Sequence, residues 1–323
     1  MQFEYNENIR GAKMIDTGKE QSVNLIKDFI KDVLNSDIDK LKDFSFLNLN
    51  TDIKYHQDEY KNIKPEHIEK YGGYFIKKGC KPTLHQCVND YDDMNLIRAI
   101  NSLLYIYEQN KIPNLAWDDM NWEYENSKPE YENYNYRGET INTFQTLIDE
   151  KSYKDFFKDI ESSGYLINKI EKFLYKLFTI GNFMLLPNKK FNLVSLNTYK
   201  GDYNGMRDYS DTFFKCILNI ENNETINKLK ETNSFWYNFK DKNNIKKFIE
   251  DNYLQDYFND NCELNYSFSH HDRHGDYDKT KDINEKYIYA LHICEYIDTV
   301  TELINKRADR MIIDLKKIIN KES

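Results

Sequence analysis

The longest repeating pattern in the chain runs from about residue 283 to 319, where apolar residues recur every three or four positions. That spacing places them along one side of an α-helix. The same stripe fits a coiled-coil seam with a second chain, or a helix lying across the core of its own domain. The many other apolar helices in the chain favour the core, with Arg307 as the one residue that interrupts the stripe. Its members are Ala290, Ile293, Ile297, Val300, Ile304, Met311, Leu315 and Ile318.

Shorter segments with the same periodicity recur through the rest of the chain. In the middle, Gly181 is predicted to stop a helix with a positive φ angle. The run "FMLLP" (183–187) then reads as a buried strand ended by Pro187, and "FNLVSLN" (191–197) as a candidate second strand. The predicted helices cover residues 20–35, 93–109, 165–178, 207–220 and 244–258.

The composition agrees with a helical protein. The chain has 26 Tyr and 19 Phe, enough to build a core, but its 11 Gly and 5 Pro are too few for an all-β chain with many tight turns. We therefore expect a mainly α fold with a small β element (α+β), a helical core and a long C-terminal helix. The predicted regions are 1–160, helical with an acidic aromatic insertion at about 114–138, and 161–323, an α+β region with the long helix.

Charge and cysteine content restrict the classes of partner and compartment. With 54 acidic and 45 basic residues, the chain lacks the basic balance of a protein that coats duplex DNA. A Lys-rich stretch at 239–247 leaves nucleic-acid binding as a weaker alternative. The five cysteines form no CxxC pair, and no signal peptide or membrane-spanning run is seen, which predicts reduced thiols in a cytoplasm. The abundance of Asn, Lys, Ile and Tyr suggests a low-GC bacterium or its phage, in which case the compartment is the host cytoplasm.

One segment, 117–138, combines acids with aromatic rings. It contains six acids and only two bases, Lys128 and Arg137, with two Trp and four Tyr among them. Aromatic anchors surrounded by carboxylates suit docking onto a protein partner with a basic surface, while an ordinary solvated loop is the alternative. The candidate partner-binding residues are Trp117, Asp118, Asp119, Trp122, Glu123, Tyr124, Tyr131 and Tyr134.

A second segment, "SHHDRHGDYD" (269–278), holds three of the seven histidines. His270, His271, His274 and Asp276 have the ligand types for a divalent metal, which would be the only cofactor expected. Gly275 disfavours a sustained helix there, and the alternative is a polar loop whose following helix is capped by Asp282. A further nucleophile candidate, the nearby His85 and Cys87, is better explained by a buried structural thiol.

The region 180–217 resembles a signature in a family of uncharacterised bacterial and prophage proteins. Lys200 stands where that family usually has Arg, and Tyr209 departs from a basic neighbour. The resemblance implies a shared fold over about 180–258 and no known reaction. With the phage-like composition, it implies an inhibitor of a bacterial defence nuclease, such as a Gabija anti-defence protein. The matching residues are Gly181, Pro187, Asn197, Gly201, Asp208, Asp211, Cys216 and Ile217.

The chemistry of this motif favours a structural role. Asn197, Lys200 and Gly201 are predicted to form a turn ahead of a helix, whose N-terminus could hold an anion. Asp208 and Asp211 in the first turn would instead cap the N–H groups and repel phosphate.

Two functional hypotheses result. The first is a non-catalytic acidic protein that binds or inhibits a partner, with no cofactor. The second is a metal-dependent hydrolase or nuclease that uses the histidine cluster. The chain lacks the P-loop, GxGxxG and GxSxG patterns of common nucleotide-binding proteins and hydrolases. A homo-oligomer formed through 283–319 is compatible with either hypothesis.

Overall fold

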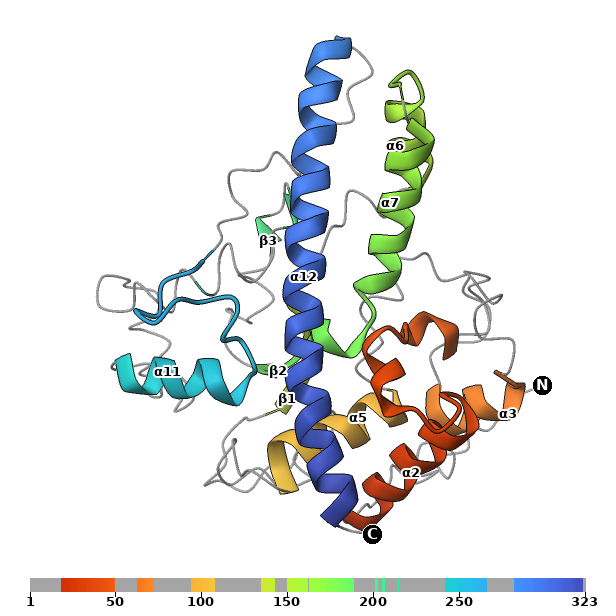
Figure 1. The fold of residues 1–323 in the computed structure, drawn as a ribbon, viewed down its shortest axis with the longest axis vertical. Coiled ribbons are helices and arrows are strands. Elements are labelled where there is room, and N and C mark those ends of the chain that lie inside the picture. Colours follow the sequence, from red (N-terminus) through yellow and green to blue (C-terminus); the bar gives the residue numbers. More distant parts are fainter. Residues whose placement is uncertain are drawn as a thin grey trace, which may run out of the picture. The chain divides into compact units, whose positions relative to one another are not determined.

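The computed structural model describes the following parts of the chain (Figure 1): residues 19–49, 63–72, 94–107, 135–142, 150–161, 163–188, 201–202, 205–206, 214, 242–265 and 282–321. The chain divides into two compact units, the first comprising Met1–Tyr136 and Met311–Ser323, the second Arg137–Arg310. Helices dominate the described residues, whose strands form two two-stranded sheets, so the predicted mainly α fold with a small β element is confirmed. The boundary predicted after residue 160 stays a prediction, because units defined by packing need not be independently folding domains.

The first unit is built from short helical elements. The helix predicted over 20–35 corresponds to α2, and the one predicted over 93–109 corresponds to α5 followed directly by the π-helix η5. The elements are α2 (Lys19–Asp32), η1 (Ile38–Lys42), η2 (Phe46–Leu49), α3 (Pro65–His67), η3 (Ile68–Gly72), α5 (Asn95–Asn101) and η5 (Ser102–Tyr107).

Aromatic rings form the core of this unit. The ring of Phe29, on α2, meets the rings of Phe44 and Tyr71 edge to face, with centroids 5.0 and 5.1 Å away. Phe46 extends the cluster from Phe44 at 5.9 Å. All four residues are completely buried, and edge-to-face packing adds to the free energy gained by burying the rings. The aromatic composition thus supplies the core, as expected.

The second unit contains the small β element. The predicted helix 165–178 is present as α7, and the predicted strand is β2, which continues past Pro187 to Asn188. The strand expected at 191–197 and most of the helix expected at 207–220 lie outside the described residues. The elements are β1 (Asn135–Thr140, which begins in the first unit), α6 (Glu150–Phe157), α7 (Ser163–Lys176), η9 (Ile180–Asn182), β2 (Phe183–Asn188), β3 (Gly201–Asp202), β4 (Gly205–Met206), α11 (Lys242–Asp251) and α12 (Ile283–Lys321).

Helix α11 is shorter than predicted, because it ends at Asp251 and not at residue 258. Tyr253 has a φ angle of 58°, in the left-handed region that ends helices. The N–H of Leu254 then reaches back to the carbonyl oxygen of Ile249 at 2.8 Å, as in a Schellman motif. A tyrosine occupies the position that usually holds glycine, so the sequence carries no ordinary stop signal there.

The long helix α12 extends to Lys321, two residues beyond the prediction. All eight residues of its predicted apolar stripe are buried within the single chain, so the stripe forms core and not a seam with a second chain. A homo-oligomer through this helix would therefore require another of its faces. The cap predicted at Asp282 is confirmed: its carboxylate accepts the N–H groups of Asn284 and Glu285 at 2.8 and 2.9 Å. The Glu285 carboxylate accepts the Asp282 N–H in return, which completes a capping box.

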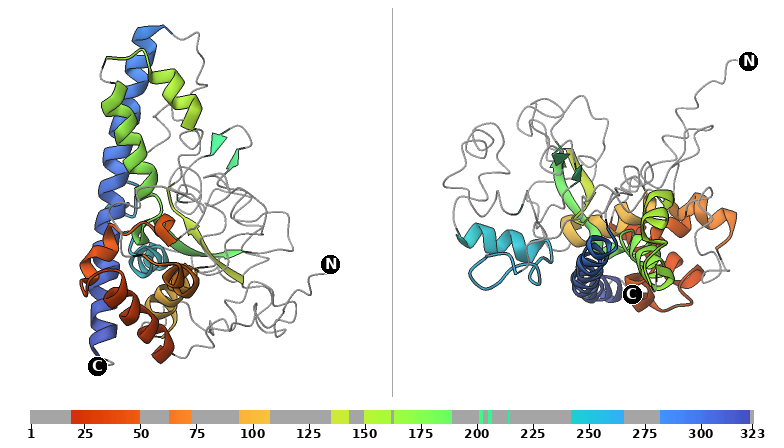
Figure 2. Two further views of the ribbon diagram at one scale, coloured as in Figure 1. Left: turned by 90° about the vertical axis from the view of Figure 1, so that its right-hand side faces the viewer. Right: turned by 90° about the horizontal axis from the view of Figure 1, so that it is seen from above.

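Helices α7 and α12 pack side by side in the second unit (Figure 2). The backbone N–H of Glu161, just before α7, donates to the Tyr287 hydroxyl at 3.1 Å. Further along both helices, the rings of Phe173 and Tyr296 meet edge to face at 5.6 Å. Residue numbers rise together along the two helices, so the helices run in the same direction.

Candidate functional site

The site residues predicted from the sequence all lie outside the described residues, so both sets stay predictions. Within the described parts of the chain, no group of three or more His, Cys, Asp or Glu side chains is arranged to hold a metal ion. The predicted partner-binding residues are Trp117, Asp118, Asp119, Trp122, Glu123, Tyr124, Tyr131 and Tyr134, and the predicted metal ligands are His270, His271, His274 and Asp276.

Only part of the 180–217 motif can be placed. Gly201 was expected in a turn ahead of a helix, but it lies in strand β3, where it pairs antiparallel with Met206 of β4. Gly201 is therefore part of a two-stranded sheet and not of the expected turn. Asn197, Asp208 and Asp211 lie outside the described residues.

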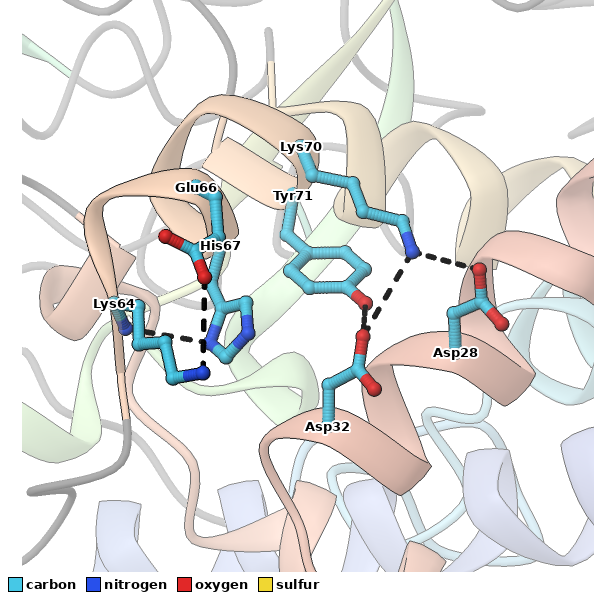
Figure 3. Close-up of polar contacts among 7 residues, drawn as sticks. All are labelled: Asp28, Asp32, Lys64, Glu66, His67, Lys70 and Tyr71. Atoms are coloured by element: carbon cyan, nitrogen blue, oxygen red, sulfur yellow. Dashed lines mark hydrogen bonds and ion pairs between the residues drawn. The ribbon is translucent and has the colours of Figure 1, made fainter.

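A polar cluster joins α2 to the π-helix η3 in the first unit (Figure 3). The completely buried Tyr71 donates its hydroxyl hydrogen to the Asp32 carboxylate, with 2.7 Å between the oxygens. The Lys70 ammonium lies 2.7 Å from a carboxylate oxygen of Asp28 and 3.8 Å from one of Asp32. Asp28 and Asp32 are one helical turn apart on α2, which is why two consecutive residues of η3 can reach both. π-Helical turns are frequent at functional sites, which makes this cluster a candidate site.

The pKa shifts of Tyr71 and Asp32 indicate a structural role for this pair. Burial raises the pKa of Tyr71 far above its ordinary value, and the hydrogen bond to Asp32 raises it further. The same hydrogen bond lowers the pKa of Asp32, with Lys70 contributing to the shift. Near neutral pH the phenol therefore stays protonated and the carboxylate stays charged. Neither group is poised to exchange a proton with a substrate.

His67 closes the other side of the cluster. Its buried ring lies 6.0 Å from the Tyr71 ring, and its Nδ1 accepts the backbone N–H of Lys64 at 3.3 Å. That bond uses a ring nitrogen to satisfy a free N–H group at the start of the short helix α3. The exposed Lys64 ammonium lies 3.7 Å from the Glu66 carboxylate. Each of these polar groups thus stabilises the fold locally, and we interpret the cluster as structural.

Arg307 connects several segments of the second unit. The sequence marks it as a misfit in an apolar stripe, yet its side chain is completely buried. Its Nε donates to the carbonyl oxygen of Asn252 at 2.9 Å, and its Nη1 donates to the carbonyl oxygens of Gly181 and Phe183 at 2.8 and 2.6 Å. The guanidinium thereby connects α12 to the ends of α11 and η9. Its position within the stripe was the signal for this role.

A second buried polar group adjoins this position. Asn182 accepts the Asn142 N–H with its side-chain oxygen and donates its amide to the Asn142 carbonyl, both at 2.9 Å. Tyr257 donates its hydroxyl to the Asn142 side chain at 2.8 Å. Buried polar groups that satisfy one another in this way favour one arrangement of the chain over its alternatives. This network is part of the core.

The described feature that fits a binding role is the outward face of α12 in the second unit. Near its N-terminal end, Ile288 and Leu291 are 55% and 69% exposed, and the ring of Tyr287 is also accessible. Further along the same face come Glu295, Asp298 and Glu302, all exposed and spaced three and four residues apart. Large apolar side chains exposed together on one helix face, with polar side chains at their rim, are typical of surfaces that contact other proteins.

The comparisons with known proteins identify a family and no function. The sequence matches the model of a family of unknown function (DUF6994) over residues 106–311, well over half of the chain. This match spans the whole second unit and includes the 180–258 region that resembles uncharacterised proteins. Neither the curated proteins nor the solved structures gave a match. None of the helices in the described residues is both long and apolar enough to cross a membrane.

Proposed function

Because the chain belongs to the DUF6994 family of unknown function, we propose a role from its own surface: it is a non-catalytic protein that binds a protein partner with a basic surface. The outward face of α12 carries this proposal. Tyr287, Ile288 and Leu291 offer apolar contact area, and the exposed Glu295 beyond them adds a carboxylate that attracts a positively charged partner. The next two carboxylates on this face, Asp298 and Glu302, are paired with Lys169 and Lys306.

Two further observations support the proposal. The chain as a whole has nine more acidic than basic residues, and its 117–138 segment adds aromatic anchors among carboxylates. The Tyr71 cluster, with its buried phenol, holds its charged groups against one another and leaves them no role in proton transfer. The titratable groups of that cluster therefore serve to stabilise the fold.

In its narrower form, the proposal is a phage- or prophage-encoded inhibitor of a bacterial antiviral defence nuclease complex of the Gabija type, acting in the host cytoplasm. A nuclease binds DNA through a basic groove, and an acidic protein with apolar anchors is suited to occupy such a groove. The test adds the purified chain to the purified Gabija complex and measures co-elution and DNA cleavage. Stoichiometric loss of cleavage with a stable complex supports this form; cleavage at the original rate without co-elution refutes it.

The competing proposal is a metal-dependent hydrolase that uses His270, His271, His274 and Asp276. It rests on the ligand types and close spacing of those residues. Metal analysis of the purified protein separates the two ideas. Stoichiometric zinc or manganese that is lost in the His270→Ala/His274→Ala variant, together with turnover of a phosphodiester, would replace the binding proposal with the enzyme.

The predicted 117–138 segment has a test of its own. If it anchors the partner, Trp117→Ala or Trp122→Ala should each weaken binding by roughly 2–4 kcal/mol, as for a central aromatic anchor. Unchanged affinity in both variants would exclude the segment from the interface.

A further inference from the structure

We draw no further inference here: the strongest candidate, the exposed apolar surface of Tyr165, Tyr287, Ile288 and Leu291 near the N-terminal ends of α7 and α12, carries nothing more because nothing in the described part of the chain shows what covers it.

Discussion

Gly181 lies directly against the backbone of Ile304. A Cβ atom at residue 181 would come within 2.0 Å of the Ile304 carbonyl oxygen and 3.1 Å of the Ala308 side chain. The glycine was predicted to stop a helix with a positive φ angle, but its φ lies outside that range and it belongs to η9. It is needed here because no larger residue fits between η9 and α12.

Gly181→Ala should therefore destabilise the protein strongly. The added methyl group meets backbone that cannot move without shifting α12, and overpacking of this kind costs about 1–3 kcal/mol or more. Urea unfolding measures the loss. Gly164→Ala is the matched control, because a Cβ there meets nothing within 4 Å and alanine favours the helix α7. Equal stability of the two variants would contradict the close contact.

Arg307→Leu should be among the most destabilising substitutions in the second unit. The variant removes the guanidinium that donates hydrogen bonds to the buried carbonyl oxygens of Gly181, Phe183 and Asn252. We expect the free energy of unfolding to fall by about 3 kcal/mol or more. Arg307→Lys should restore only part of the lost stability, because an ammonium group cannot make the same set of hydrogen bonds as the planar guanidinium. Arg310→Leu serves as control: its pairing with Asp256 is partly exposed and contributes about 1 kcal/mol or less.

Tyr71→Phe should lower stability by about 1–3 kcal/mol at neutral pH, because it removes a hydrogen bond to a charged carboxylate. The difference from wild type should depend on pH at both ends. The lowered pKa of Asp32 stabilises the fold above its ordinary value of 3.8, and this contribution is lost as pH falls through the folded value below it. The raised pKa of Tyr71 stabilises the fold below pH 10, and this contribution is lost as pH rises above 10.

Denaturant unfolding at pH 3, 7 and 11 checks this profile. Tyr165→Phe, at an exposed position, should follow wild type throughout. A Tyr71→Phe difference that is the same at pH 7 and pH 3 would show that the hydrogen bond to Asp32 does not form.

Asp282→Ala should fray the start of α12. The variant loses the acceptor for the Asn284 and Glu285 N–H groups, which costs about 0.5–2 kcal/mol. Amide exchange at these two residues should accelerate, whereas exchange near Ile304 should stay slow. Asp282→Asn keeps a side-chain oxygen at the cap and should retain most of the protection.

The sequence predicted the elements whose signal is local. α2, α7 and α12 were found because their apolar residues repeat with the helical period, and the Asp282 cap because it directly precedes such a repeat. The end of α11 was missed because Tyr253 takes the left-handed conformation that favours glycine. The π-helical geometry of η3 and η5 has no counterpart in the apolar pattern.

The contacts that define the cores could not be predicted, because they join distant parts of the chain. Tyr71 meets Asp32 across 39 positions, and Arg307 meets Gly181 across 126. An arginine within an apolar stripe indicates a buried acceptor, but periodicity cannot say which segments provide it. The exposed apolar residues near the start of α12 could not be predicted for a similar reason, since the rest of the fold decides which helix faces are covered.

The hydrogen bonds of Arg307 also delay the completion of the second unit during translation. The carbonyl groups that it binds belong to residues 181, 183 and 252, all of which leave the ribosome before the guanidinium does. Until residue 307 emerges, those oxygens must be solvated by water, and the second unit remains unfinished while most of its chain is already outside the exit tunnel. A nascent chain stalled before that residue should accordingly be captured by chaperones and cut by proteases far more readily than one released just beyond it.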